Sequence, residues 1–135
     1  MRPYSQVIEQ LRNAGLRPTR QRLALAKLLF ENSPRHVTAE TLHAEAQAAS
    51  VPVSLATVYN TLHQFTDAGL LREVVIDPQR SHFDTTTTNH GHFYFEETGT
   101  LQDIPASDVV LAKMPSLPAG TKATSVEVVV RLSAN

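Results

Sequence analysis

Cysteine is absent from all 135 residues of the sequence. Its absence excludes disulfides, thiolate metal sites and thiol catalysis in this chain. The sequence also lacks an apolar run near the roughly 20 residues that a membrane-spanning helix needs. Its beginning, MRPYSQVIEQ, lacks the apolar segment of a secretory signal. We therefore expect a cytoplasmic protein without a membrane partner.

The charges are unevenly divided between the two halves of the chain, although the net charge is only −1. Residues 1–72 carry eight Lys and Arg against five Asp and Glu, a balance of +3. Residues 73–135 carry four basic against eight acidic side chains, a balance of −4. A basic half joined to an acidic half suggests two tasks, with the basic half a candidate for binding phosphates. Chance segregation in a small protein is the alternative.

Hydrophobic residues make up 41% of the sequence, enough for a packed core, and their spacing predicts four helices in the first half. Thr38 and Ser54 are the expected N-caps of the third and fourth helices, and Gly69 is the expected stop of the fourth. The predicted helices cover residues 4–14, 19–32, 39–49 and 55–68. The apolar face of the third consists of Ala39, Leu42, Ala46 and Ala49, and that of the fourth of Leu55, Val58, Leu62 and Phe65.

A β-ribbon is predicted after these helices, because LLREVVI and SHFDT flank the turn sequence DPQR at 77–80. Helices followed by a ribbon are the layout of a winged helix, a variant of the helix-turn-helix. The rest of the chain predicts strands at 91–97 and 100–104, a short helix at 105–114, and a strand with Val126, Val128, Val130 and Leu132 on one face. We expect an α+β protein with a winged helix-turn-helix domain at 1–84 and a small α/β domain at 85–135.

The exposed face of the predicted helix at 55–68 could read bases in the major groove of DNA. Ala56, Thr57, Tyr59 and Asn60 lie near its N-terminal end, where recognition helices usually make contact. Asn can pair with adenine, Thr and Ala can contact a thymine methyl, and Tyr can reach a phosphate or a base. The alternative is that Tyr59 and Asn60 are ordinary solvated helix residues.

The stretch RPTRQR places Arg17, Arg20 and Arg22 near the start of the second predicted helix. Guanidinium groups there could hold DNA phosphates, because arginine donates paired hydrogen bonds to phosphate oxygens. A solvated basic face is the alternative. The helix order, the ribbon and the basic charge of the same half together favour DNA binding.

His90 and His92 are one residue apart in a segment that reads as a strand, so their side chains should point to the same side. Two imidazoles on one side are a common start to a transition-metal site. Asp84 ends the ribbon and Asp103 lies on the next predicted strand, so either carboxylate could join them. A ligand set of nitrogen and oxygen suits Fe(II), Mn(II) or Zn(II). A polar strand face without a ligand is the alternative, and His36, judged by position alone, is a loop histidine.

Several stretches of the sequence together resemble the ferric uptake regulator family in order and spacing. They are LRNAGLRPTRQRLALAKLL, RHVTAETLH, VPVSLATVYNTLHQFTDAGLL, HFDT and HGHFYFEETGTLQDI, and the resemblance covers roughly residues 7–132. It implies a homodimeric winged-helix transcription factor that binds double-stranded DNA. It also implies a C-terminal α/β dimerisation domain, and a metal site at the hinge that sets the DNA-binding geometry.

The same resemblance assigns roles to single residues. The regulatory metal ligands of the family fall on His36, Asp84, His90, His92 and Asp103. His36 thereby becomes a ligand from the DNA-binding half that clamps this half to the other. The recognition-helix tyrosine of the family falls on Tyr59, and the basic residue before its second helix falls within residues 17–22.

The sequence also departs from the family pattern. Most members carry a CxxC pair for a structural zinc, and Phe95 and Thr98 occupy those positions here, which excludes a zinc site of that type. The dimer should therefore rely on apolar packing of strands such as 126–132. Asn89 and Gly91 replace two residues of a second histidine-rich site found in some members. The absence of cysteine and the early C-terminus resemble the iron response regulator branch, which senses haem status.

From this resemblance we expect a metal- or haem-responsive transcriptional regulator of iron homeostasis. Haem could bind His90 and His92, although the histidine triplet of the haem-sensing branch reads NHGH here. Asp84 and Asp103 resemble the ligand choice of the peroxide-sensing branch, which is the alternative within the family. A small metal-dependent hydrolase and a winged helix that binds protein are alternatives from other classes. We expect no enzyme, because no residue is obviously placed as a general base.

Overall fold

A computed structural model describes residues 5–135 of the chain. Tyr4, the first residue of the first predicted helix, lies outside the described residues. The chain divides into two compact units, residues 1–87 and residues 88–135. Among the helices described, none is both long and apolar enough to cross a membrane.

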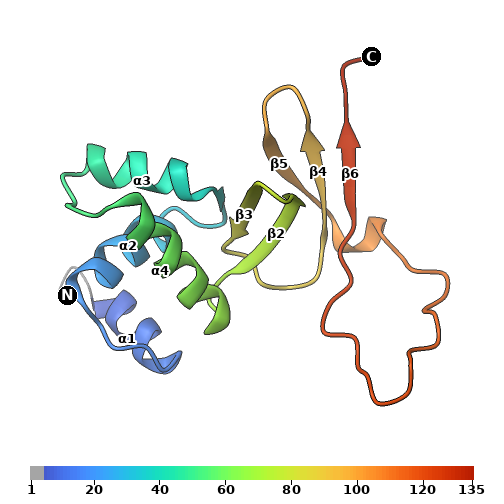
Figure 1. The fold of residues 1–135 in the computed structure, drawn as a ribbon, viewed down its shortest axis with the longest axis horizontal. Helices are drawn as coiled ribbons and strands as arrows, with labels where there is room; N and C mark the ends of the chain where they lie inside the picture. Colours follow the sequence, from blue (N-terminus) through green and yellow to red (C-terminus); the bar gives the residue numbers. More distant parts are fainter. Residues whose placement is uncertain (1–4) are drawn as a thin grey trace. The chain divides into compact units, whose positions relative to one another are not determined.

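Four helices form most of the first unit, and three of them begin at a capping side chain (Figure 1). Thr19, Thr38 and Ser54 each accept a hydrogen bond from the backbone N–H three residues later, at 3.2, 3.1 and 3.1 Å. These bonds satisfy N–H groups that have no partner within the helix, and they confirm the predicted caps Thr38 and Ser54. The helices are α1 (Ser5–Asn13), α2 (Arg20–Phe30), α3 (Ala39–Ala48) and α4 (Leu55–Asp67).

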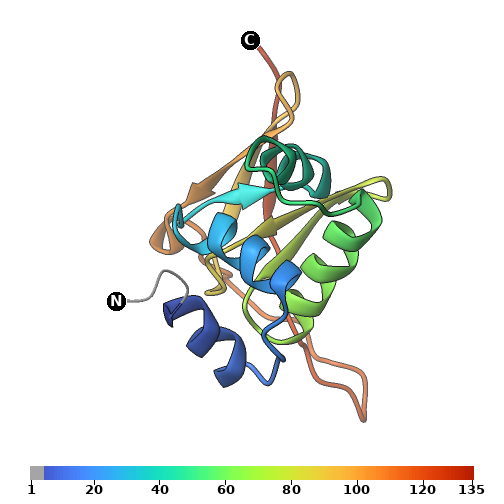
Figure 2. The same ribbon diagram turned by 90° about the vertical axis from the view of Figure 1, so that its left-hand side faces the viewer.

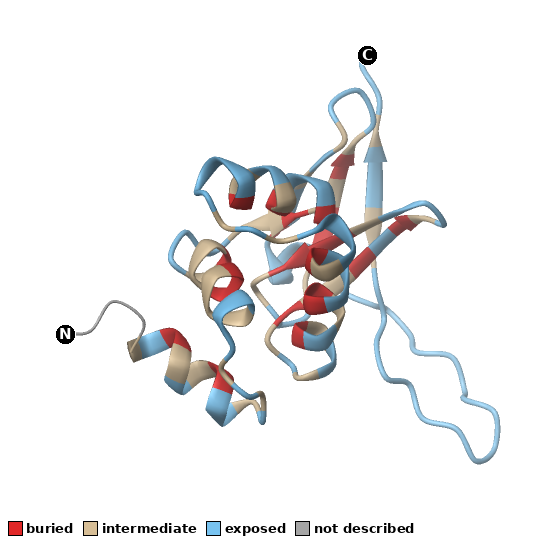
Figure 3. Ribbon diagram, turned by 60° about the vertical axis from the view of Figure 1, so that its left-hand side comes forward, coloured by how far each residue is buried: buried red, intermediate tan, exposed pale blue. Residues whose placement is uncertain are grey.

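The core of the first unit forms where the apolar faces of its helices meet (Figure 3). Leu25 and Leu29 of α2, Leu42 of α3, and Leu62 and Phe65 of α4 are all fully buried. Burial of one such side chain contributes about 1.5–3 kcal/mol. Packing, more than helix propensity, therefore holds these helices together, and Figure 2 shows α1 beside α2 at one side of the unit.

The buried face of α4 differs from the predicted one at its first residue. Val58, Leu62 and Phe65 are buried as expected, but Leu55 is 41% exposed because it opens the helix, one turn outside the core. The expected stop is confirmed, since Gly69 follows the C-cap with a φ of +83°, a conformation that glycine adopts without strain. The predicted apolar face of α3 likewise ends early, because Ala49 is the exposed C-cap of that helix.

A three-stranded antiparallel sheet completes the first unit. Strands β2 (Arg72–Asp77) and β3 (Arg80–Asp84) form the predicted hairpin, whose turn includes a 2.9 Å bond from the Gln79 N–H to Asp77 Oδ1. Strand β1 (His36–Val37) pairs with β3, so the order is β1-β3-β2. The sequence did not predict β1, because two residues carry no periodic signal. The helices and the hairpin make the expected winged helix-turn-helix.

The second unit is built on a mixed sheet with the order β5-β4-β6 (Figure 1). Strand β4 (Gly91–Phe95) pairs antiparallel with β5 (Thr100–Ile104) and parallel with β6 (Val129–Leu132). Tyr94 and Ile104 are its buried apolar side chains among the described residues. The protein is therefore α+β, as the sequence predicts.

The prediction of a helix at 105–114 is wrong. A single turn of 3₁₀ helix, η1 (Ala106–Asp108), is all that forms there, and residues 109–128 contain neither helix nor strand. Val109 is extended, with φ −122° and ψ 103°, a conformation that suits a β-branched side chain. Val110 is 80% exposed, so a helix at this point would lack the packing that stabilises short helices.

The last predicted strand is shorter than expected. It begins at Val129 instead of residue 125, and β6 pairs only with β4 among the described residues. On the face predicted to be apolar, Val126 and Val130 are 40% and 39% exposed. Val126 precedes the strand, and Val130 lies on an edge strand with a neighbour on one side only, so both side chains are less covered than alternation alone suggests.

Candidate metal centre and DNA-reading face

In the first unit, the sheet places His36 of β1 directly opposite Asp84 of β3. His36 Nε2 lies 3.2 Å from Asp84 Oδ2, and the Asp84 side chain is only 1% exposed. The other carboxylate oxygen, Oδ1, accepts a 2.8 Å hydrogen bond from the Thr86 N–H. A buried carboxylate needs such partners, because taking its charge out of water is costly. Ladder and turn together hold one imidazole nitrogen beside one carboxylate oxygen.

In the second unit, the sheet pairs His92 of β4 with Asp103 of β5, and His90 immediately precedes β4. The Nε2 atoms of His90 and His92 lie 3.0 and 3.3 Å from the same atom, Asp103 Oδ1. The two imidazole rings are 4.4 Å apart between centroids. The predicted alignment of the two histidines is therefore present, and Asp103 joins them. Two imidazoles and one carboxylate form a ligand set that suits a divalent transition metal.

These three side chains are unequally exposed and are held by the backbone around them. The exposed fractions are 8% for His90, 2% for His92 and 42% for Asp103. His90 Nδ1 lies 2.6 Å from the Thr88 carbonyl oxygen, which can only accept, so Nδ1 carries the hydrogen and donates. The Nε2 atom is then the nitrogen available to a cation. Metal-binding histidines usually have their second nitrogen fixed in this way.

Gly91 separates the two histidines at a point where a Cβ atom would be closely surrounded. A Cβ atom there would lie 3.3 Å from the Val128 carbonyl oxygen and 3.3 Å from Val109 Cγ2. The same carbonyl accepts a 3.0 Å hydrogen bond from the His92 N–H. A side chain at position 91 would therefore disturb the hydrogen bond between the His92 N–H and the Val128 carbonyl oxygen, which helps to position His92.

The polar face predicted for DNA reading lies at the N-terminal end of α4. Ala56, Tyr59 and Asn60 are exposed, and Thr57 is partly buried. The Ser54 hydroxyl donates a 3.0 Å hydrogen bond to Thr57 Oγ1, which ties Thr57 to the helix cap. Tyr59, with 48% of its surface exposed, is the largest group on this face.

Tyr59 is supported by His63, a residue that sequence reasoning did not assign to the site. The two rings are 4.5 Å apart in an edge-to-face contact. His63 also meets the ring of Phe83 at 5.4 Å, and its Nε2 lies 3.9 Å from Glu73 Oε2. The spacing of one helical turn between residues 59 and 63 could have predicted the first contact. The contacts with β2 and β3 depend on the tertiary fold.

The three arginines predicted to bind phosphate lie in different environments. Arg17 and Arg20 are exposed, and their side chains make no hydrogen bond or ion pair with residues 5–135. Arg22 is partly buried, and its Nε and Nη2 donate to Gln64 Oε1 at 3.3 and 3.0 Å. Its Nη1 donates to the Arg17 carbonyl oxygen at 3.0 Å. Gln64 was not predicted as a site residue, although it lies one turn beyond Asn60 on the same face.

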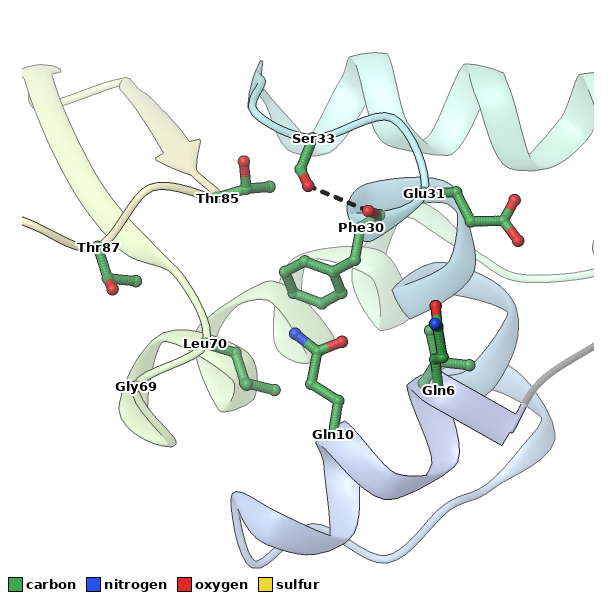
Figure 4. A pocket seen from close by; sticks show the side chains of 10 residues that line it. Gln6, Gln10, Phe30, Glu31, Ser33, Gly69, Leu70, Thr85 and Thr87 are labelled. Carbon is green, nitrogen blue, oxygen red and sulfur yellow. Dashed lines mark hydrogen bonds between the residues drawn. The ribbon is translucent and has the colours of Figure 1, made fainter.

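A pocket of about 400 Å³ opens in the first unit between α1 and the ends of α2 and α4 (Figure 4). Gln6 and Gln10 of α1 line it together with the ring of Phe30, whose carbonyl oxygen accepts a 3.0 Å bond from Ser33 Oγ. None of the predicted site residues lines this pocket. It is therefore separate from the candidate site.

The helix order and the hairpin define a winged-helix protein with a second, smaller α/β unit. The model of the ferric uptake regulator family matches residues 13–130, and the chain belongs to this family. The peroxide-responsive repressor PerR of Staphylococcus aureus (strain Mu50) is 36% identical over 96 residues, which are 71% of this chain and 64% of that protein. The chain thus spans less than two thirds of the length of this curated relative. The family is one of regulators, in agreement with the expectation of no enzyme.

Solved structures agree with this family. The ferric uptake regulator from Pseudomonas aeruginosa, solved with manganese, is 25% identical with a TM-score of 0.71, over 93% of this chain and 96% of that chain. The ferric uptake regulator of Vibrio cholerae is 22% identical with a TM-score of 0.73, over 95% and 99%. The similarity to the Vibrio cholerae protein is a similarity of fold.

Proposed function

We propose that this chain is a metal-responsive, DNA-binding transcriptional regulator that acts as a homodimer on promoter operators. The observation that carries the proposal is the approach of two imidazole Nε2 atoms, those of His90 and His92, to within 3.3 Å of Asp103 Oδ1. In a chain of the ferric uptake regulator family, this cluster supports a sensing site.

The proposed metal site takes ligands from both units. The first unit offers an imidazole and a carboxylate, and the second offers two imidazoles and a carboxylate. Either set alone is small, because zinc takes about four ligands and octahedral ions take about six. We propose that one divalent ion, Fe(II), Mn(II) or Zn(II), joins the two sets. The relative from Pseudomonas aeruginosa was solved with manganese, which supports an ion of this kind. The ligands are His36, Asp84, His90, His92 and Asp103.

The proposed response to metal is thermodynamic linkage. An ion that needs ligands from two units favours the arrangement of the units in which all the ligands can reach it. It shifts the equilibrium by as much as its affinity differs between the arrangements. In a dimer, only some arrangements place the two recognition helices at the spacing of operator half-sites. Metal binding and DNA binding are then coupled.

The proposed DNA-binding surface is the exposed face of α4 with the arginines near the start of α2. It consists of Arg17, Arg20, Arg22, Ala56, Thr57, Tyr59 and Asn60. Recognition helices read bases with residues near their N-terminal end, where Tyr59 and Asn60 are exposed. The side chains of Arg17 and Arg20 are exposed and make no hydrogen bond or ion pair with residues 5–135, which suits phosphate contacts. Such a regulator would act in the cytoplasm, where promoters are found.

The proposed dimer forms through the second unit. Several large apolar side chains of this unit are at least 39% exposed, and isolated soluble chains rarely leave large apolar patches uncovered. A second copy of the chain would cover them without any sulfur-ligated zinc. The exposed residues are Val110, Leu111, Met114, Leu117, Val126 and Val130.

The proposed biological role is iron homeostasis, in the manner of the iron response regulator branch, and the absence of cysteine supports this branch. The relative from Staphylococcus aureus is a peroxide-responsive repressor, which supports peroxide sensing as the second candidate. Two treatments separate them. A Soret band that His90→Ala removes would support haem sensing. Loss of DNA binding after the Fe(II)-loaded protein meets hydrogen peroxide would support peroxide sensing.

The central experiment measures DNA affinity with and without metal. A duplex is first selected by the wild-type protein from a random pool in the presence of Mn(II). Fluorescence anisotropy then gives its affinity after chelation and after Mn(II) addition. The double variant His90→Ala/His92→Ala should lose the difference between the two conditions. The control is His43→Gln, because His43 lies on α3 and its Nε2 contacts the Val53 carbonyl oxygen at 3.1 Å. A double variant that responds like the wild type would refute the site.

A further inference from the structure

The carbonyl oxygen of Gln64 is bound by Arg22, and this fixes the direction of its amide group. Arg22 Nε and Nη2 lie 3.3 and 3.0 Å from Gln64 Oε1. A guanidinium group has hydrogen-bond donors and no acceptor, so the atom that faces it must be the amide oxygen. The orientation of the Gln64 amide therefore follows from chemistry.

This arrangement leaves Gln64 with donors only. An amide oxygen has two lone pairs, and both receive an N–H from Arg22. The Nε2 group keeps its two hydrogens, and none of residues 5–135 accepts a bond from it. Gln64 is exposed and lies one helical turn after Asn60, on the polar face of α4. The Gln64 amide thus offers only hydrogen-bond donors on the face that is proposed to bind DNA.

Arg22 is poorly available as a phosphate ligand. Three of its N–H groups are used by protein acceptors, since Nη1 also donates to the Arg17 carbonyl oxygen at 3.0 Å. To bind a phosphate, Arg22 would have to break these hydrogen bonds. Arg20 lies on the same helix and is exposed, and its side chain makes no such bonds with residues 5–135. The two arginines therefore have different tasks.

We propose that Gln64 donates a hydrogen bond from Nε2 to an acceptor of the DNA, and that Arg22 is a positioning residue that orients it. The inference rests on the proposed function as a DNA-binding regulator. A free glutamine reads adenine with one donor and one acceptor, and Gln64 has no acceptor left for this. Its partner is an atom that only accepts, either a phosphate oxygen or an acceptor on a base edge such as the N7 atom of guanine. Its place in the second half of α4 favours the phosphate, because bases are read by the first turns.

The test uses the duplex selected by the wild-type protein and four Mn(II)-loaded proteins: the wild type, Gln64→Met, Arg22→Met and Arg20→Met. Affinity is measured by anisotropy over a series of KCl concentrations. Gln64→Met should weaken binding by about five- to tenfold, as expected for one hydrogen bond. Arg22→Met should weaken it similarly with an unchanged salt slope. Arg20→Met should lower the slope by about 0.9, because it removes a charge from a phosphate contact.

A second arm identifies the acceptor. A methylphosphonate in the selected duplex removes one phosphate oxygen and its charge, and 7-deazaguanine in place of guanine removes the N7 acceptor. The modification that removes the partner should weaken the wild type and leave Gln64→Met unaffected, because interacting groups are non-additive. A loss with methylphosphonate assigns a phosphate, and a loss with 7-deazaguanine assigns a base.

The outcomes separate this inference from the proposed function. If Arg22→Met lowers the salt slope as Arg20→Met does, Arg22 is a phosphate ligand and the inference is wrong. Wild-type affinity in Gln64→Met also overturns the inference. Because Gln64 is exposed, its replacement should not disturb folding, so this variant tests the inference even if Arg22→Met does not fold. In both cases the regulator function stands. If the wild type selects no duplex at all, the proposed function fails and the inference falls with it.

Discussion

His36 and Asp84 face each other across the ladder of β1 and β3, with Nε2 and Oδ2 3.2 Å apart. The pair places an imidazole and a nearly fully buried carboxylate within the unit that carries α4, the proposed recognition helix. Strand β1 is only two residues long, so its pairing with β3 is what holds His36 in place. Changes at this pair should therefore report on metal binding from the DNA-binding side.

Replacing Asp84 by asparagine should lower metal affinity without unfolding the protein. Asparagine keeps an oxygen for the Thr86 N–H, which donates at 2.8 Å, but it carries no charge for a cation. We expect the affinity for Mn(II) to fall at least about tenfold, measured by isothermal titration calorimetry. Asp108→Asn, in the exposed turn η1, is the matched control. Equal affinities for the two variants would remove Asp84 from the ligand set.

Metal should stabilise the folded protein, because an ion that binds only the native state shifts the unfolding equilibrium. At a free concentration one hundred times its Kd, the gain is about 2.7 kcal/mol. Scanning calorimetry should show a higher Tm with Mn(II), and chelation should return the Tm to its value without metal. The variant His90→Ala/His92→Ala should show no rise. A rise of the same size in that variant would place the ion elsewhere.

Gly91→Ala should damage the site through the backbone. The added Cβ would sit 3.3 Å from the Val128 carbonyl oxygen, which the His92 N–H binds, so this carbonyl must shift by a few tenths of an ångström. We expect a loss of about 1–3 kcal/mol in the free energy of unfolding, and weaker Mn(II) binding. Thermal unfolding and calorimetry measure the two effects. Gln102→Ala, at an exposed position of β5, should leave both unchanged.

His63 should affect DNA binding through Tyr59. Removing the imidazole in His63→Ala takes away the edge-to-face contact at 4.5 Å that supports the Tyr59 ring. Such contacts contribute about 0.5–1.5 kcal/mol, so we expect operator affinity to fall by about fivefold. His63→Phe retains a ring and should recover most of the loss. Anisotropy with the selected duplex gives both values, and an unchanged affinity in His63→Ala would show that Tyr59 needs no such support.

Much of the first unit could be predicted because its signals are local. Thr38 and Ser54 precede apolar residues at helical spacing, and the hairpin is marked by the turn at 77–80. The alignment of His90 and His92 likewise follows from the alternation of side chains along one strand. In each case the pattern lies within a few residues of the structure that it predicts.

What could not be predicted depends on contacts between distant segments. Strand β1 exists because β3 lies beside it, and His36 therefore reads as a loop residue in isolation. The bond between Arg22 and Gln64 joins two helices, and no spacing rule connects them. The helix predicted at 105–114 shows the converse, since a helix-like sequence without a packing surface forms only one turn of 3₁₀ helix.

Asp103 is the open member of the cluster in the second unit, with 42% of its side chain exposed against 2% for His92. A cation held there would have to enter and leave past this carboxylate. The affinity for the ion depends on all the ligand atoms. The rate of ion exchange depends in addition on how readily the Asp103 side chain changes its conformation. A change at this one position should therefore alter the rate of ion exchange together with the affinity for the ion.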